Sequence, residues 1–190
     1  MELLIYEDKT FEGIVYTEKV VKGREFQSCT FKGCNLSNSD FSGNKFIDCT
    51  FDGCNLSMIK LSGTTLNGVV FDNCKMLGIN FSECQNFLFS VMFRSSILDY
   101  TSFMGKKMPK TKFIKSSLKE ATFSGAILTG SVFDQTDLLG TVFNRTDLTE
   151  TNFVTALNYT IDPELNIMKK ASFSELGLAG LLSKYQLKIV

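Results

Sequence analysis

The sequence predicts an all-β protein whose chain winds into a four-sided stack of coils. Three observations predict this fold class. An apolar residue recurs at every fifth position, a small or β-branched residue lies two places before most of these apolar centres, and phenylalanine occurs 18 times while tryptophan is absent. Inward positions two residues apart are typical of a short extended segment. An odd period would flip the face of a continuous strand, so the chain must turn after each five residues.

Four equal turns close a square, so each coil takes about 20 residues and stacked coils form a solenoid. The apolar centres run in two series, from Phe11 to Phe81 and from Leu88 to Phe153. They are expected to form the core, where each buried side chain contributes roughly 1.5–3 kcal/mol of transfer free energy. Together the two series predict about seven coils, which at the spacing of neighbouring strands make a rod about 34 Å long.

A change of register separates the two series. Phe81 and Leu88 are seven residues apart instead of five. We therefore expect residues 82–87 to form a bulge or a small kink, with Phe87 and Phe89 partly exposed beside it. The extra residues are either a tolerated insertion or a kink that shapes a binding face, and the sequence leaves both interpretations open.

A second irregularity is a lysine at an inward position, Lys106. An unpaired charge is not stable in an apolar core, so we expect the backbone to bulge there or the side chain to reach out at a corner. This residue belongs to a basic girdle, which is a solvated face or, as the alternative, a direct DNA-binding site. The girdle consists of Lys106, Lys107, Lys110, Lys112, Lys115 and Lys119.

Four segments are expected along the chain: an N-terminal cap over residues 1–10, two parts of the solenoid over 11–87 and 88–155, and a capping and dimerisation segment over 156–190. In the last of these, Ser174 is predicted to cap a short helix, and 186–190 alternate as in a strand. This tail has more apolar residues than one coil end needs, so we favour a two-fold dimer over simple capping. The expected interface residues are Phe173, Leu178, Leu181, Leu182, Tyr185, Leu187 and Ile189.

Composition argues against an enzyme. Histidine is absent, which excludes histidine bases and histidine metal ligands. No nucleophile–base pair, metal cluster or glycine-rich phosphate loop stands out, so neither a catalytic residue nor a cofactor is expected. No apolar stretch is long enough to span a membrane and no signal peptide is recognised, so we expect a cytoplasmic protein.

Cysteines occupy the same pattern. Five of the six lie two residues before an apolar centre, at spacings that are multiples of five. We therefore expect buried, reduced thiols that act as small apolar side chains. Cys34, Cys54 and Cys74 are expected to stack in one column. A metal-binding or redox role is the alternative.

Charge is balanced overall but unevenly distributed. The 20 basic and 20 acidic residues give no net charge. Residues 60–119 carry nine basic and three acidic side chains, a balance of +6, whereas residues 120–164 carry one basic and seven acidic, a balance of −6. If the tails join two chains, the dimer is a rod about 70 Å long with an acidic centre. The residues expected to contact a partner are Glu120, Asp134, Asp137, Asp147 and Glu150.

The five-residue pattern resembles the pentapeptide-repeat family, whose consensus is roughly A-(D/N)-L-x-x. It occurs here as Cys34-Asn35-Leu36-Ser37, Cys54-Asn55-Leu56-Ser57, Thr136-Asp137-Leu138 and Thr146-Asp147-Leu148. The resemblance covers Phe11 to about Phe153 and implies a right-handed quadrilateral parallel β-helix.

The tail from Phe173 reads Phe-Ser-x-x-Gly-Leu-x-Gly-Leu-Leu and looks like the corresponding tail of the Qnr and MfpA group within this family. That resemblance implies a homodimeric, DNA-like rod that binds a type II topoisomerase, either DNA gyrase or topoisomerase IV, and protects it from quinolones. The alternative is a structural scaffold or interaction module with a different partner, because fold alone does not choose among functions. Direct nucleic-acid binding is not expected, since the aromatic residues are assigned to the core.

Overall fold

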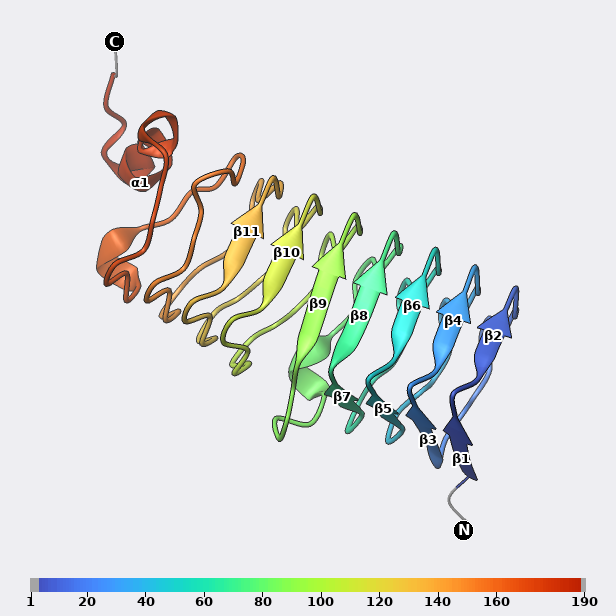
Figure 1. Ribbon diagram of the computed structural model, residues 1–190. Coiled ribbons are helices and arrows are strands. Elements are labelled where there is room, and N and C mark those ends of the chain that lie inside the picture. Colours follow the sequence, from blue (N-terminus) through green and yellow to red (C-terminus); the bar gives the residue numbers. More distant parts are fainter. Residues whose placement is uncertain (1–3, 189–190) are drawn as a thin grey trace.

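The computed structural model describes residues 4–188 and confirms the predicted stack of about seven coils (Figure 1). Strands lie on two adjacent sides of the coil and pair in parallel throughout. On one side they are β1 (Leu4–Glu7), β3 (Arg24–Gln27), β5 (Lys45–Ile47) and β7 (Thr65–Asn67). On the next side they are β2 (Thr10–Glu12), β4 (Thr30–Lys32), β6 (Thr50–Asp52), β8 (Val69–Asp72), β9 (Val91–Arg94), β10 (Lys112–Ile114) and β11 (Val132–Asp134).

On the other two sides the coils are joined by isolated parallel bridges. Asn35 pairs with Asn55, and Asp40 pairs with Lys60. Each of these pairs is separated by 20 residues, which is the coil length predicted from the five-residue period. The fold class expected from the sequence, a quadrilateral parallel β-helix, is confirmed.

Stacked aromatic rings fill the interior. Phe113 is 0% exposed and stacks on Phe93 and Phe133, with ring centroids 5.2 Å and 4.8 Å apart. It also meets Phe103 and Phe123 edge to face, at 6.0 Å and 5.6 Å. Offset-stacked and edge-to-face pairs are the favoured aromatic geometries. The recurrent phenylalanines therefore stabilise each coil against its neighbours.

Corners of the coil require a left-handed backbone. Asn38 has φ of 57° and Gly68 has φ of 66°. Asparagine and glycine tolerate this region better than other residues do. Gly68 has a second constraint, because a Cβ atom there would collide with the Asp48 carboxylate on the preceding coil.

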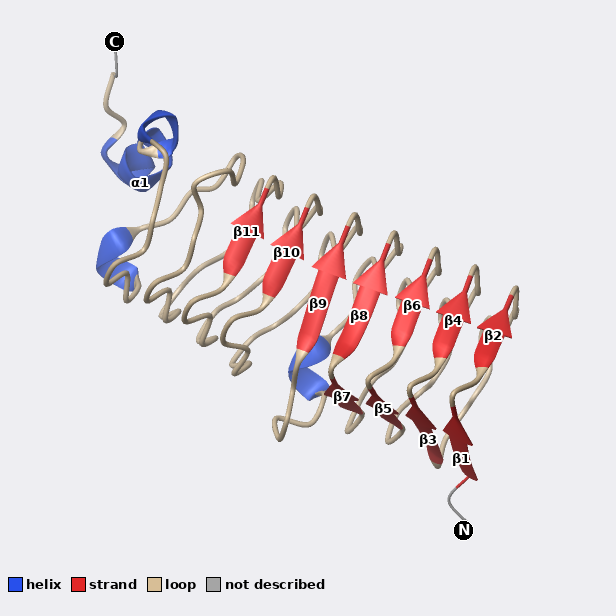
Figure 2. Cartoon of the chain, in the orientation of Figure 1, coloured by secondary structure: helices blue, strands red, loops and turns tan. Residues whose placement is uncertain are grey.

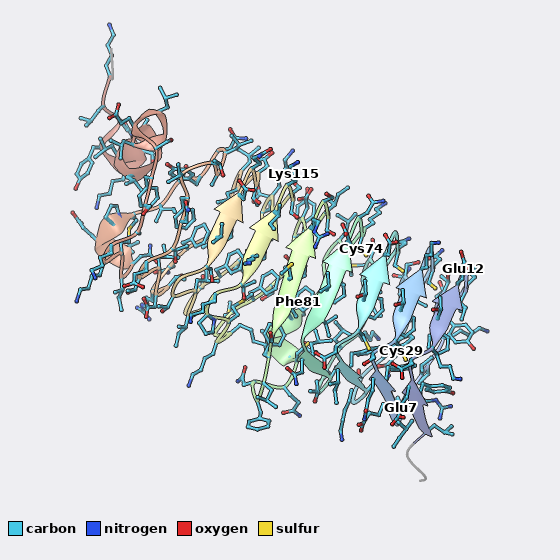
Figure 3. All side chains as sticks on the ribbon, in the orientation of Figure 1. Glu7, Glu12, Cys29, Cys74, Phe81 and Lys115 are labelled. Atoms are coloured by element: carbon cyan, nitrogen blue, oxygen red, sulfur yellow. The ribbon has the colours of Figure 1, made fainter. Side chains whose placement is uncertain are left out.

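Cysteines lie inside the stack, as predicted. All six are buried and free of disulfides. The Cys34 amide donates to the sulfur of Cys54 at 3.4 Å, one coil away. Burial raises the pKa of Cys49 to about 11 and that of Cys84 to about 12. Figure 3 shows Cys29 and Cys74 within the coils, whereas Glu12 and Lys115 lie at the exposed margins.

Native alkylation should therefore be slow. At pH 8 we expect iodoacetamide to label fewer than one thiol per folded chain, because all six thiols are buried and out of reach of the reagent. Unfolding in urea should expose all six thiols to the same reagent. Mass spectrometry of the labelled chain counts the adducts, and rapid native labelling of several cysteines would contradict this packing.

The change of register is present, but its details differ from expectation. Partners are 20 residues apart from Phe51 to Phe71 and 22 apart from Phe71 to Phe93. A 3-10 turn, η1 (Phe81–Glu83), precedes the extra residues, and Figure 2 shows it beside β7. Phe87 is 78% exposed, as predicted.

Two predictions at this insertion are wrong. Leu88 was expected to begin the second apolar series, yet it is 55% exposed and has φ of 57°. Phe89 was expected to be partly exposed, yet it is buried. The left-handed turn at Leu88 directs the next ring inward, so Phe89 fills the core position instead.

The prediction for Lys106 is also wrong. Its side chain does not reach out at a corner but is buried, 1% exposed. The ammonium donates to the carbonyl oxygens of Cys84 and Gln85 and, at 3.0 Å, to the Asn86 side-chain oxygen. It also lies 4.6 Å from the centroid of the Phe89 ring. The two irregularities of the sequence are therefore one feature, because the inserted loop supplies the acceptors that the buried cation requires.

The N-terminal stretch contributes a side of the first coil. Residues 4–7 of the segment expected as a cap form β1, which pairs with β3 in the register of the later coils. Ile5 is 52% exposed and Tyr6 is half-buried at the end of the stack. No described residue covers this end, which opens to solvent as a cavity.

The C-terminal segment contains the predicted helix in shortened form. Ser174 accepts a hydrogen bond from the Gly177 amide, and the turns η3 (Glu175–Gly177) and η4 (Ser183–Tyr185) flank a single-turn helix, α1 (Ala179–Leu182). A further turn, η2 (Pro163–Leu165), precedes them. The terminal strand expected over 186–190 is not formed by residues 186–188, and residues 189–190 lie outside the described part. In the described chain, no helix could cross a membrane.

Candidate functional site

The five carboxylates expected to contact a partner form a band around the later coils, not one patch. Asp134 ends β11, while Asp137 and Asp147 take part in parallel bridges on two other sides of the coil. Glu120 and Glu150 occupy corners with positive φ. The fourth side, residues 141–144, carries no acidic side chain.

Two of these carboxylates are neutralised by ion pairs. Lys119 lies 3.2 Å from the Asp137 carboxylate, and Lys170 lies 3.8 Å from that of Glu150. Burial alone would raise the pKa of Asp137, but hydrogen bonds from Asn158 and Lys119 hold it below its usual value. Asp137 is therefore charged and already paired within the chain.

The other three carboxylates form no ion pair with described residues. Asp134 accepts a hydrogen bond from the Thr155 hydroxyl at 2.7 Å. Asp147 accepts from the Thr149 amide at 3.0 Å, and hydrogen bonding by Thr149 lowers the pKa of this carboxyl. Glu120, Asp134 and Asp147 thus supply the uncompensated negative charge of the band, which the sequence alone did not distinguish from the paired carboxylates.

The helical tail folds back over the last coil. Gly180 accepts a backbone hydrogen bond from Ile161 at 3.0 Å. Lys184 lies 2.8 Å from Asp162 and 2.7 Å from Glu164, and the Tyr185 hydroxyl donates to Glu164 at 3.0 Å. Hydrogen bonds from Lys184 hold the pKa values of both carboxyls below their usual range. These contacts fix the orientation of the tail.

Two glycines permit this close approach of the tail to the last coil of the same chain. A Cβ atom at Gly177 would collide with the Tyr159 hydroxyl, and one at Gly180 would collide with the Tyr159 carbonyl oxygen. The hydroxyl of Tyr159 is itself buried without a hydrogen-bond partner in the described structure.

The residues expected at a dimer interface fall into three groups. Phe173 stacks on Phe153 at 5.1 Å and Leu181 packs against the core, so both stabilise the single chain. Ile189 lies outside the described residues. The remaining four are exposed: Leu178, Leu182, Tyr185 and Leu187.

Sequence reasoning missed further apolar side chains beside this tail. Leu176 is 97% exposed and adjoins an open cavity of about 390 Å³, which Leu157 and Tyr159 also line. Leu165 and Ile167 are exposed on the adjoining coil. Ile167 and Leu157 occupy outward positions of the five-residue pattern, where polar residues are usual, and that signal could have identified them.

The geometry defines the class of protein: a parallel β-solenoid built from five-residue repeats, with an acidic band and an apolar helical tail. Pentapeptide repeat regions match residues 24–103, and eight copies of the pentapeptide repeat match residues 107–153. The chain therefore belongs to the pentapeptide-repeat family. No curated protein matches the sequence.

Solved structures show the same fold. One trypsin-treated variant of QnrB1, described as a plasmid-mediated fluoroquinolone resistance protein, matches with a TM-score of 0.69 at 16% identity, covering 95% of this chain and 100% of that one. A second trypsin-treated variant matches with a TM-score of 0.64 at 16% identity, covering 100% of both chains. The fold is thus shared over essentially the whole length of the chain.

Proposed function

We propose that this protein binds a type II topoisomerase, DNA gyrase or topoisomerase IV, as a non-catalytic dimeric rod, and protects it from quinolones. The observation that carries the proposal is the full-length structural match to QnrB1, a fluoroquinolone resistance protein. The tail from Phe173, which resembles that of the Qnr and MfpA group, supports it independently of the coil stack. We propose the cytoplasm as its location, because its proposed partner acts on DNA there.

Electrostatics supply a mechanism for such binding. Duplex DNA presents one negative charge per about 1.7 Å of its axis, and a surface that holds DNA is complementary to negative charge. The unpaired carboxylates Glu120, Asp134 and Asp147 lie on the coils nearest the tail, so a dimer joined there would present them on both sides of its centre. Charge arranged in this way steers a partner and fixes register more than it adds affinity.

The apolar tail supplies the dimer contact. Leu178, Leu182 and Tyr185 are exposed on one short segment, and the ion pairs of Lys184 hold that segment against the coil. Exposed apolar side chains gathered at one end of a soluble rod are typical of a protein interface. A two-fold axis through this end would cover the patch on both chains at once.

A supercoiling assay tests the proposal. Purified protein should lower the sensitivity of gyrase or topoisomerase IV to ciprofloxacin, or inhibit supercoiling or decatenation, at micromolar concentration. The same assay run with no quinolone separates inhibition from protection. No effect on either enzyme of the host would reject the proposal.

The acidic band gives the first prediction for this function. Replacing its three unpaired carboxylates together (Glu120→Gln, Asp134→Asn, Asp147→Asn) should weaken topoisomerase binding about tenfold, since complementary charge is lost. Surface plasmon resonance on immobilised enzyme measures it. The matched control removes three charges from the early coils (Glu18→Gln, Asp48→Asn, Asp52→Asn), where Glu18 occupies a corner with positive φ as Glu120 does and Asp52 stands on the same side of the coil as Asp134. Equal losses in both variants would contradict a role for the band.

The apolar tail gives the second prediction for this function, which concerns the dimer. Leu178→Asp with Leu182→Asp should convert a dimer into a 21.2 kDa monomer, because two charges cannot be buried at an apolar interface without partners. Multi-angle light scattering measures the mass. Ile97→Asp is the control, because Ile97 is 44% exposed on a coil in the middle of the stack. A wild-type mass of one chain at every concentration would contradict the dimer.

A scaffold with a different partner is the second candidate. The net charge of zero favours it, since a surface built only to replace DNA would carry excess acid. Affinity capture from host lysate with the wild-type chain and the triple-amide variant distinguishes the two functions. A topoisomerase captured by the wild type alone supports the first, and a different protein captured by both supports the second.

A further inference from the structure

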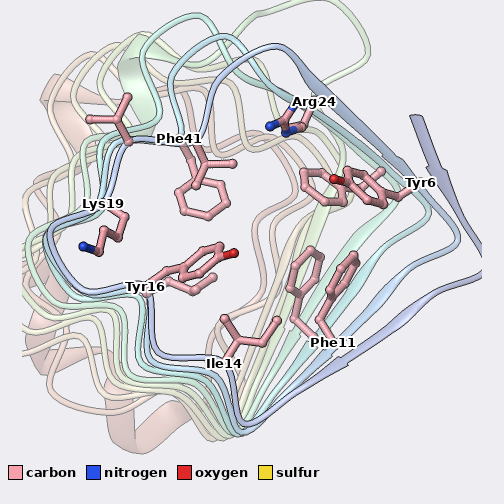
Figure 4. Close-up of a pocket in the computed structure, with 12 residues that line it drawn as sticks. Tyr6, Phe11, Ile14, Tyr16, Lys19, Arg24 and Phe41 are labelled. Atoms are coloured by element: carbon pink, nitrogen blue, oxygen red, sulfur yellow. The ribbon is translucent and has the colours of Figure 1, made fainter. Parts of the chain in front are cut away.

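The N-terminal end of the coil stack is a cavity of about 370 Å³ (Figure 4). Its walls are the inward side chains of the first coils, among them Tyr6, Phe11, Tyr16 and Val21. Ligand sites commonly have volumes of roughly 300–1,000 Å³ and mostly apolar walls. The end of the stack therefore has the size and lining of a site for a small ligand.

Side chains at this end differ from those of the coils beneath it. The first coil places tyrosine at two inward centres, Tyr6 and Tyr16, where the next coil has Phe26 and Leu36. Figure 4 shows both tyrosine hydroxyls directed into the mouth of the cavity. A tyrosine combines an apolar ring with a polar end and suits a surface that is partly wet. This composition fits an amphipathic occupant better than a dry apolar one.

Arg24 supplies a positive charge to the lining of this cavity. It occupies an inward position of the pattern, two residues before Phe26, and lines the cavity. Asn44 and Thr64 hold the same position in the next two coils, and both are 0% exposed. The side chain of Arg24 therefore starts from an inward position at the end of the stack, where the interior opens into the cavity.

No carboxylate of the described residues forms an ion pair with Arg24. Two carboxylates of the first coils are engaged elsewhere: Glu25 pairs with Lys45 at 3.1 Å, and Asp40 pairs with Lys22 at 2.9 Å. Among the residues that line the cavity there is a second cation, Lys19, and no acid. Lys106, the other cation at an inward position, donates to acceptors of its own chain. Arg24 differs from it because no carboxylate of the described residues pairs with its side chain.

We propose that the N-terminal cavity binds a small amphipathic carboxylate, with its apolar body against the aromatic walls and its carboxylate on the Arg24 guanidinium. A guanidinium can hold a carboxylate through two parallel hydrogen bonds, which gives both strength and orientation. The Tyr6 and Tyr16 hydroxyls, which face the mouth of the cavity, offer further hydrogen-bond donors to an occupant. The site is independent of the acidic band and of the tail, and it lies at the opposite end of the rod.

Octanoate is the probe, and isothermal titration calorimetry is the measurement. We expect one octanoate per chain, with Kd of about 1 mM or tighter. Octylamine, which has the same apolar chain and the opposite charge, should bind at least about tenfold more weakly. Arg24→Gln should weaken octanoate binding about tenfold or more, whereas the matched control Lys32→Gln, on the outside of β4, should leave it unchanged.

A filled-cavity variant keeps the test independent of folding. Val21→Phe places a ring above Phe41, as in the other aromatic columns, so it should abolish octanoate binding while the melting temperature stays equal or rises. Leu176→Ser should leave binding unchanged, which excludes the apolar tail as the site. Absence of octanoate binding, or binding that survives both Arg24→Gln and Val21→Phe, would overturn the proposal. A particle mass that falls in Val21→Phe, without octanoate binding to the wild type, would also overturn it and identify the cavity as an interface between copies.

Discussion

Phe113→Ala should lower the free energy of unfolding by about 3–5 kcal/mol, because it leaves a cavity in a column of stacked rings. Phe113 is fully buried and contacts four other phenylalanine rings, on its own coil and on both neighbours. In a solenoid each coil is stabilised only by adjacent coils, so one missing ring weakens both interfaces at once. Urea denaturation followed by circular dichroism measures the change.

The matched control is Phe87→Ala, which removes the same atoms from an exposed position. Phe87 is 78% exposed on the inserted loop, so its loss should change the stability by no more than about 0.5 kcal/mol. Similar losses in the two variants would contradict the assignment of the phenylalanine column to the core.

Lys106→Ala is the second substitution with a large expected effect. It removes the ammonium that three oxygen acceptors of the inserted loop share, and it leaves a cavity beneath Phe89. Buried acceptors without a donor cost about 1–3 kcal/mol, and truncation of a long buried side chain adds to that cost. We expect a loss of about 2–4 kcal/mol and faster hydrogen exchange of the backbone amides of residues 85–90.

Two further variants separate the charge from the volume. Lys106→Met keeps the length of the side chain and removes only the donor, so it should lose less stability than Lys106→Ala while the loop still exchanges faster. Lys107→Ala, an exposed neighbour, should be close to neutral. Unchanged loop exchange in Lys106→Ala and Lys106→Met would contradict the role of this lysine in fixing the insertion.

The sequence was sufficient to predict the coil because the five-residue period corresponds directly to the length of one side of the coil. Each apolar centre from Phe26 to Phe81 is buried where the period places it. The same reasoning failed at the insertion, where spacing alone cannot say which of Leu88 and Phe89 turns inward. That choice depends on the left-handed backbone at Leu88, which no periodic pattern specifies.

Lys106 shows a second feature that the sequence pattern alone does not predict. A rule about unpaired buried charge is sound, but pairing depends on segments that are remote in sequence. Here the acceptors come from residues 84–86, about 20 positions earlier. Likewise, the acidic residues of the band were recognised by composition, whereas only the structure separates the ion-paired Asp137 from the unpaired Asp134.

In the tail, too, the sequence predicted the general features but not the role of each residue. Its apolar excess was evident from the sequence, and Ser174 does cap a short turn, but that turn is the 3-10 turn η3, and the helix α1 that follows has no side-chain cap. The contributions of individual residues were not evident, because Phe173 continues the internal stack of rings, whereas Leu176 is almost fully exposed.

Direct binding to a type II topoisomerase is the most immediate test of the proposed function. Dye-labelled protein can be titrated with DNA gyrase and with topoisomerase IV of the same host, and fluorescence anisotropy followed as linear duplex DNA is added. The account predicts saturable binding with Kd of about 1 µM or tighter, and progressive displacement by the DNA. Absence of binding to both enzymes, or a complex that excess DNA leaves intact, would contradict it.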